Sequence, residues 1–232
     1  NLAYGADAAF SFFQNVNIGG YFARSETDTL RKDNDSYQGR FDYTGDRYGA
    51  QLHYLKVGDN FNPEVGFVRR DNFARTSSSL RFSPRPKTRF KSVRQFTYQG
   101  TVEYIENGAG QLETRNQIGH FEMERQNSDA FTIDAGPRYE LLLRPFTVAP
   151  GVTIPPGSYH FADATMSYRM GQQRRFSGTV SLQQGQFYDG TIRALSFTGA
   201  RVALLKQWSV EPSLSVNKVA LPAGRFTTTV FR

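Results

Sequence analysis

The sequence contains no cysteine and no long run of apolar residues. The absence of cysteine rules out disulfide bonds and thiolate chemistry, and it fits an oxidising compartment where spare thiols are a liability. A membrane-spanning helix needs roughly 18–20 consecutive apolar residues, and no stretch of this chain approaches that length. No signal peptide opens the sequence at Asn1, so we expect any export signal to have been removed or to lie outside these residues.

Clustered positive charge is also lacking, although the 232 residues carry a net charge of +7. Lys and Arg are scattered from Arg24 to Arg232, mostly singly, with Asp and Glu between them. Nucleic-acid binding needs basic residues gathered on one face, so we expect no nucleic-acid partner. A scattered basic surface fits the phosphates of outer-membrane lipid and lipopolysaccharide equally well. These are the expected partners, with other outer-membrane or periplasmic proteins as further candidates.

Aromatic residues and glycine are plentiful, and they lie in alternating segments. The chain has 20 Phe, 12 Tyr and 21 Gly, a mixture typical of pleated, half-buried strands. Apolar and polar residues alternate with the two-residue period of a strand in segments 4–12, 37–44, 48–54, 95–104, 131–141, 176–183 and 208–216. We count about 13 strands, many near the roughly 9–11 residues that cross a bilayer as a tilted strand. Helical periodicity is convincing nowhere.

The connections between these strands are expected to alternate in length. Short turns are expected at Gln14-Asn15, Gly45-Asp46, Pro84–Lys87, Gln126–Ser128 and Gly171–Gln173. Longer loops are expected at Glu26–Asp35, Val57–Asp71, Glu106–Gly110, Thr147–Pro156, Gln184–Gly190 and Asn217–Gly224. Such sorting is typical of outer-membrane barrels, which have short periplasmic turns and longer extracellular loops. The sequence therefore predicts an all-β, antiparallel up-and-down transmembrane β-barrel, or a large portion of one.

Strand direction also bears on the length of the barrel. The first connection is of the short kind, so the first strand runs towards the periplasmic end. Single-chain bacterial barrels normally have even strand counts, and an odd count that begins with such a strand implies at least one more strand before Asn1. We therefore expect residues 1–232 to form a single barrel domain that is incomplete at one or both ends.

Alternation predicts which side chains share a face. The residues expected to face lipid are Tyr4, Phe10, Phe41, Leu52, Val102, Phe131, Val180 and Val210. The residues expected to line the lumen are Arg40, Gln51, His53, Arg81, Gln99, Glu103, Glu122, Asp134, Arg138 and Glu140. Aromatic side chains at strand ends, among them Tyr21, Phe22 and Trp208, are expected to form interfacial girdles.

Two stretches resemble a known family. The sequence Val57–Asp71 (VGDNFNPEVGFVRRD), followed by Leu80–Pro86 (LRFSPRP), is similar to the hallmark stretch of an uncharacterised family of bacterial outer-membrane proteins. Ala149–Tyr159 (APGVTIPPGSY) is similar to another recurring piece of the same family. In its members a family-9-like carbohydrate-binding domain precedes a C-terminal β-barrel domain of unknown function. Here that first domain is absent, and members continue through several more strands past the point matching Arg232. The resemblance implies a barrel in the bacterial outer membrane but supplies no substrate.

No metal or cofactor site is expected. Asp59, Asn60, Asn62 and Glu64 could offer oxygen ligands to calcium, but their spacing does not match the calcium-loop pattern. Asn and Asp side chains that bond the backbone of a turn account for them more simply. The three His residues lie far apart in the sequence, without a partner at zinc-ligand spacing.

Catalysis is not expected either. The acidic residues Glu122, Glu124 and Asp134 could suggest the carboxylate pair of a glycoside hydrolase. Cross-strand ion ladders are the stronger interpretation, since polar lumens commonly carry them. No G-x-S-x-G elbow and no glycine-rich phosphate loop appears in the sequence.

Two hypotheses for function follow from the predicted barrel. In the first, the barrel is a channel or transport pore for polar solutes, with glycan-related solutes suggested by the family resemblance. In the second, it is a surface anchor or assembly platform with a plugged lumen. A soluble β-sandwich binding module is a third and weaker alternative. A pore of about 16 strands would leave an aqueous channel, whereas a small barrel would be filled by side chains.

Overall fold

The computed structural model describes residues 2–26, 32–63, 70–203 and 208–232. The described residues form strands and connections, and no helix occurs among them. Accordingly, none of them belongs to a helix long and apolar enough to cross a membrane. The prediction of an all-β fold is thus confirmed for this part of the chain.

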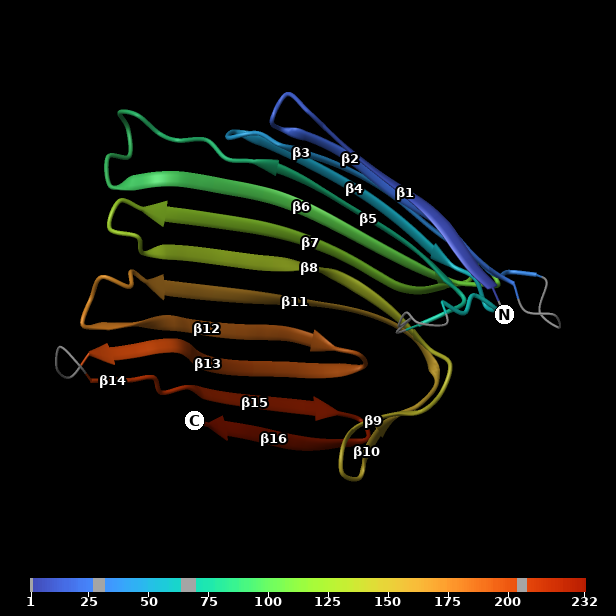
Figure 1. The fold of residues 1–232 in the computed structure, drawn as a ribbon. Helices are drawn as coiled ribbons and strands as arrows, with labels where there is room; N and C mark the ends of the chain where they lie inside the picture. Colours follow the sequence, from blue (N-terminus) through green and yellow to red (C-terminus); the bar gives the residue numbers. More distant parts are fainter. Residues whose placement is uncertain (1, 27–31, 64–69, 204–207) are drawn as a thin grey trace. The chain divides into compact units, whose positions relative to one another are not determined.

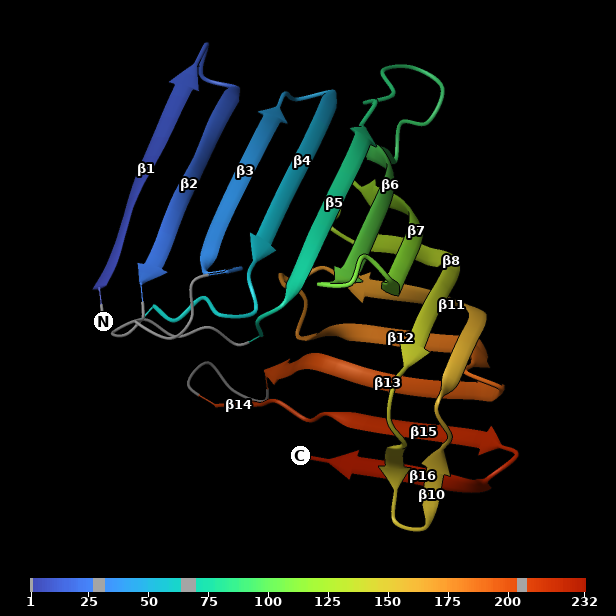
Figure 2. The same ribbon diagram turned by 90° about the vertical axis from the view of Figure 1, so that its right-hand side faces the viewer.

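The strands belong to two compact units, which we describe separately. The first unit comprises Asn1–Phe82 and Thr101–Asn116. Its complete strands are β1 (Leu2–Phe12), β2 (Val16–Glu26), β3 (Asp35–Thr44), β4 (Tyr48–Val57) and β5 (Phe73–Phe82). Figure 2 shows these five strands side by side. Parts of β6 (Val93–Asn107) and β7 (Leu112–Arg125) complete the unit.

The second unit comprises Ser83–Gly100 and Gln117–Arg232. It holds the remaining parts of β6 and β7 together with β8 (Ala130–Leu142), β11 (Gly157–Met170), β12 (Phe176–Phe187), β13 (Gly190–Ala203), β14 (Ser209–Val210), β15 (Leu214–Leu221) and β16 (Gly224–Phe231). Two short strands, β9 (Phe146–Ala149) and β10 (Val152–Ile154), form a separate two-stranded sheet.

Hydrogen bonding joins the long strands in chain order. The order is β1-β2-β3-β4-β5-β6-β7-β8-β11-β12-β13-β15-β16, and β14 adds to β13 to give a 14-stranded sheet (Figure 1). The predicted up-and-down antiparallel arrangement is therefore confirmed, against an expectation of about 13 strands. Within the described residues, β1 pairs only with β2 and β16 only with β15. The sheet thus has two end strands, and a closed barrel remains a proposal.

Strand register separates apolar from polar side chains in the first unit. Phe10 lies opposite Ile18, which lies opposite Phe41, which in turn lies opposite Leu52. Between these positions, Arg40 lies opposite His53 and Asp42 opposite Gln51. Because successive side chains of a strand point to opposite faces, one face of this unit is apolar and the other is polar. We call these the apolar face and the polar face.

The predicted sorting of loop lengths is confirmed for some connections and wrong for others. The short turns at Gln14-Asn15 and Gly45-Asp46 are present, but the connection predicted at Pro84–Lys87 spans residues 83–92. The loops predicted at Gln184–Gly190 and Asn217–Gly224 are tight turns of only Tyr188-Asp189 and Pro222-Ala223.

The misplaced loops have a physical explanation, because their glycine and asparagine serve strands rather than turns. A Cβ at Gly185 would lie 2.4 Å from the Cα of Asp163, so glycine permits the close approach of β12 to β11. The side-chain amide of Asn217 donates to Thr228 Oγ1 at 3.1 Å across β15 and β16. Both residues belong to continuous ladders, which is why no loop forms at either site.

The buried apolar cluster of the second unit lies where β9 and β10 pack on the sheet. Val152 and Ile154 from β10 are buried with Val219 and Leu221 from β15. Burying a side chain of this size contributes roughly 1.5–3 kcal/mol. The small hairpin is therefore held to the sheet by hydrophobic packing rather than by strand pairing.

Asp129 fixes two neighbouring connections of the second unit to each other. Its side chain is 1% exposed. It accepts hydrogen bonds from the Gly171 backbone N–H at 2.8 Å, the Tyr168 hydroxyl at 2.7 Å and the Arg174 guanidinium at 2.6 Å. The bond from Gly171, followed by that from Tyr168, outweighs burial and lowers the pKa of Asp129 below its ordinary value of 3.8. Residues 126–129 are thereby tied to residues 171–175.

We predict that Asp129 makes stability depend on pH. Its folded-state pKa is lowered, so its contribution is present above pH 3.8 and is lost as pH falls through the folded-state pKa. Asp129→Asn should lower the guanidinium midpoint of unfolding at about pH 7 and shrink its loss on acidification to about pH 3. The exposed Asp189→Asn is the control and should behave as the unmodified protein does. An unchanged acid response in Asp129→Asn would refute this assignment.

Candidate functional site: the polar face of the sheet

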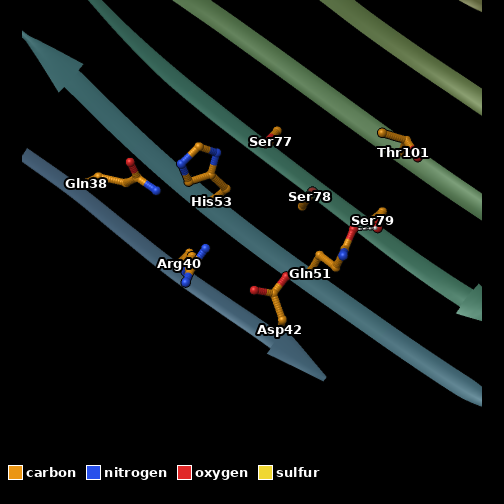
Figure 3. A pocket seen from close by; sticks show the side chains of 9 residues that line it. All are labelled: Gln38, Arg40, Asp42, Gln51, His53, Ser77, Ser78, Ser79 and Thr101. Carbon is orange, nitrogen blue, oxygen red and sulfur yellow. Dashed lines mark hydrogen bonds between the residues drawn. The ribbon is translucent and has the colours of Figure 1, made fainter. Parts of the chain in front are cut away.

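The polar face of the first unit carries a groove that is lined almost entirely by polar side chains. Its cavity volume is about 320 Å³. The lining residues come from β3, β4, β5 and β6, and they are Gln38, Arg40, Asp42, Gln51, His53, Ser77, Ser78, Ser79 and Thr101. Figure 3 shows the side chains of Arg40 and Asp42 on β3 beside those of Gln51 and His53 on β4. Three of the predicted lumen residues, Arg40, Gln51 and His53, are thus brought together.

Hydrogen bonding in this groove is incomplete. Ser79 donates to Gln51 Oε1 at 3.1 Å. The His53 Nε2 atom is buried and has no hydrogen-bond partner within the described residues. An unpartnered polar atom beside an open polar groove can bond water or a polar solute that enters the groove.

Two arginines and a glutamate extend the polar face beyond the groove. Arg75 Nε donates to Glu103 Oε1 at 2.7 Å, and Asn116 Nδ2 donates to the other oxygen of the same carboxylate at 3.1 Å. Arg81 Nη2 donates to the Gly45 carbonyl at 2.6 Å. The predicted residues Arg81 and Glu103 therefore share the face of Arg40. Sequence reasoning missed Arg75, because the run of serines in β5 weakens the alternation of apolar and polar residues there.

One face of the second unit carries a ladder of cross-strand polar pairs, and we call it the polar face of that unit. His120 Nδ1 lies 2.7 Å from Asp134 Oδ1, and Arg138 Nε donates to Asp163 Oδ1 at 2.9 Å. The second oxygen of Asp163 accepts from Gln183 Nε2 at 2.7 Å, which joins β8, β11 and β12. Of these residues, the sequence had indicated Asp134 and Arg138.

The remaining predicted residues also lie on this ladder or beside it. Arg169 Nη2 lies 3.5 Å from Glu122 Oε1. Glu140 lies opposite Tyr159, on the same face as Arg138 because both occupy even positions of β8. Gln99 follows Tyr98 in β6, so its side chain points to the face opposite the Tyr98 ring, which contacts Phe121. Asp163 and Arg169 were missed because their partners are set by strand register rather than by local sequence.

The arrangement of these carboxylates is that of a structural ladder. Asp134 and Asp163 each contact a basic side chain on a neighbouring strand, and Glu122 of β7 contacts Arg169 two strands away, on β11. Among the described residues, no group of three or more His, Cys, Asp or Glu side chains is placed to hold a metal ion. Such pairs hold strands in register and leave a surface of mixed charge.

The described residues of the weak calcium candidate, Asp59, Asn60 and Asn62, lie in a segment that is hydrogen-bonded to another part of the chain. Asn60 Nδ2 donates to the Lys32 carbonyl at 2.8 Å, and the Asn62 backbone N–H donates to Ser25 Oγ at 3.0 Å. These bonds tie residues 58–63 to the end of β2 and to the connection that follows it. Asp59 lies in the same turn, and Glu64 lies outside the described residues.

The opposite face exposes large apolar side chains. Leu52 is 53% exposed and Leu80 is 70% exposed, whereas Ser79, the neighbour of Leu80 on the polar face, is 9% exposed. Seven of the eight side chains expected to face lipid are more than a third exposed, and the eighth, Phe131, is half-buried; the seven are Tyr4, Phe10, Phe41, Leu52, Val102, Val180 and Val210. Phe131 lies on the same face, opposite Tyr168 of β11, and Tyr168 in turn lies opposite Val180 of β12.

One predicted girdle residue is misplaced. The Tyr21 hydroxyl hydrogen-bonds Ser36 Oγ at 3.0 Å, so Tyr21 belongs to the polar face. Its neighbour Phe22 lies on the apolar face, and Trp208 is 70% exposed. Tyr21 and Phe22 are adjacent in one strand, so their side chains point to opposite faces. The two residues therefore cannot belong to one girdle.

We predict that the Arg138–Asp163 pair contributes measurably to stability. Asp163 has a side-chain exposure of 7%, and Arg138→Gln would leave that carboxylate without its charged donor. Because Arg138 itself is 38% exposed, we expect a loss of only about 1–2 kcal/mol in the free energy of unfolding. Arg169→Gln, at a longer and more exposed pair, should cost less than about 0.5 kcal/mol. Denaturant titration measures both, and equal losses would contradict this ranking.

Comparison with known proteins does not identify the function of this chain. Comparison of the chain with protein-family models, with curated proteins and with solved structures gave no match. The family resemblance of residues 57–71, 80–86 and 149–159 therefore remains an expectation from the sequence, and the function has to be argued from the two faces of the sheet.

Proposed function

We propose that the chain forms the membrane-embedded wall of a β-barrel in the bacterial outer membrane, and that its polar face lines a channel for polar solutes. The observation that carries this proposal is the exposure of the apolar face. In a soluble sandwich, apolar faces pack against each other to form a core. Here Leu52, Leu80 and Leu182 are each more than half exposed, whereas polar-face side chains such as Arg138 and Asp163 bond each other. Lipid is the solvent that suits such a surface.

Strand length supports the same proposal. β1 to β5 have 10 or 11 residues each, and β6, β7, β8, β11, β12 and β13 have between 12 and 15. A tilted strand needs about 9–11 residues to cross a bilayer. Unpaired backbone groups cost several kcal/mol each in hydrocarbon. In the proposed barrel the outer edges of β1 and β16 are therefore paired.

The polar face suits a water-filled path. Its groove at Arg40, Gln51 and His53 offers both donors and acceptors, and the ladder in the second unit offers both signs of charge. We assign the chain no catalytic reaction, because Glu103, Asp134 and Asp163 are held in cross-strand pairs with basic side chains. The family resemblance, with its bacterial outer-membrane location and its glycan-related context, enters this proposal as an expectation only.

Charge reversal at Arg40 tests the channel. Within the described residues no hydrogen bond or ion pair of Arg40 is found, so Arg40→Glu changes the charge of the groove without breaking either kind of bond. A unit charge about 6 Å from a passing ion acts with about 0.7 kcal/mol in water. We therefore expect a several-fold shift of ion preference towards cations at low salt, seen as a change of reversal potential in a planar bilayer.

The matched control is Lys87→Glu, which makes the same charge change at an exposed residue of the β5–β6 connection. It should shift the reversal potential much less than Arg40→Glu does. Equal shifts would place the conducting path elsewhere. A bilayer that stays electrically silent at high protein load would favour the anchor hypothesis instead.

A further inference from the structure

The connection between β8 and β11 folds back as an ordered hairpin. β9 and β10 pair antiparallel, with Thr147 and Thr153 hydroxyls 3.0 Å apart. Gly151 takes a φ of +77° at the tip, a conformation that favours glycine. Both ribbon views show the hairpin beside the turn between β15 and β16 (Figures 1 and 2). It adds no strand to the main sheet.

The hairpin docks on the polar face of the second unit. Its buried residues Val152 and Ile154 pack with Val219 and Leu221 of β15. These two share odd positions of that strand with Asn217, whose side chain bonds both Ser215 and Thr228. Ile192, which also contacts the cluster, lies opposite Gly185, and Gly185 lies opposite Asp163 of the ladder. The hairpin therefore covers the face that carries the Arg138–Asp163 pair.

The sheet beneath the hairpin is adapted to receive it. Along the polar face of β15 the residues change from Ser215 and Asn217 to Val219 and Leu221 where the hairpin lies. A Cβ at Gly224 would come within 3.0 Å of Val152 Cγ2, so glycine leaves room for the hairpin. A loop that merely passed over this face would need neither feature.

Aromatic contacts fix the other side of the hairpin. The ring of Tyr188, in the β12–β13 turn, lies 6.2 Å from Phe146 of β9 and 5.3 Å from Tyr159 of β11. The Tyr159 hydroxyl in turn donates to the Pro155 carbonyl at 2.8 Å, just after β10. Both ends of the hairpin are thus held to the sheet.

We propose that the β9–β10 hairpin is a fixed, uncharged constriction inside the mouth of the channel, which limits the size of the solutes that pass. This inference rests on the proposed function, because only in a closed barrel does the polar face become a lumen. Loops folded into the lumen are one of the ways in which barrels are plugged. Residues 146–154 (FTVAPGVTI) contain no charged side chain. The hairpin therefore acts on size and leaves ion preference to residues such as Arg40.

Deletion of residues 146–154 is the direct test. The five residues that remain, 143–145 and 155–156, can connect Leu142 to Gly157, because these two lie directly opposite each other. We expect a larger single-channel conductance with an unchanged reversal potential in a salt gradient. In the full-length chain, Ile154→Asn should release the hairpin and act in the same direction. Thr153→Ser, at an exposed neighbouring position of the same strand, keeps the hydroxyl that bonds Thr147 and should leave the conductance unchanged.

Cysteine labelling tests the docking without any measurement of current. The chain has no cysteine, so Ile154→Cys and Thr153→Cys each introduce a single thiol. A water-soluble maleimide should label Cys at 153 and leave Cys at 154 unreacted until the protein is denatured. Equal labelling would overturn the inference, as would conductance that is unaffected by the deletion in a protein that does conduct. If neither the unmodified protein nor the deletion variant conducts while Cys at 154 is protected, the channel fails and the constriction with it, although the hairpin is docked.

Discussion

Hydrogen bonds between neighbouring antiparallel strands determine which side chains share a face of this sheet. Phe41 lies opposite Leu52 and Arg40 opposite His53 only in the observed register of β3 and β4. A slip of one residue would place Arg40 opposite Leu52 and exchange the two faces of a strand. The polar groove, the ion ladder and the exposed apolar face all depend on this register.

The two faces differ in the interactions that their side chains make. On the polar face, charged groups form hydrogen bonds across the strands, as Asp163 does with both Arg138 and Gln183. Side chains of the apolar face are not covered in this way by other residues of the chain, and Leu80 is 70% exposed. Most soluble proteins bury the apolar side of a sheet, since burial of apolar area is the main favourable term in folding. Large exposed apolar patches mark surfaces that meet lipid or another protein, and this exposure is the basis of the membrane proposal.

Local sequence was sufficient for the strands and insufficient for what joins them. The two-residue alternation indicated the faces of Arg40, Gln51 and Leu52 because a strand's period can be read without knowing its neighbours. The tight turn at Tyr188-Asp189 was not foreseen, because Gly185 signals a turn by composition but serves close strand approach to Asp163. The hydrogen bonds of Asp129 depend on Arg174, and the docking of the hairpin depends on Val219, both of which are distant in the chain. Contacts of this kind follow from register and topology, which no local pattern contains.

The most direct test of the membrane account compares two adjacent alanines of β1. Ala8 and Ala9 are both exposed and differ only in the face that they occupy, with Ala8 on the apolar face and Ala9 on the polar face. The free energy of unfolding should be measured in lipid vesicles for Ala8→Arg and Ala9→Arg. If the apolar face meets lipid, Ala8→Arg should cost about 2–4 kcal/mol near the bilayer centre, and Ala9→Arg should cost far less. If both substitutions have the same small effect, the apolar face is not in contact with lipid and the account is wrong.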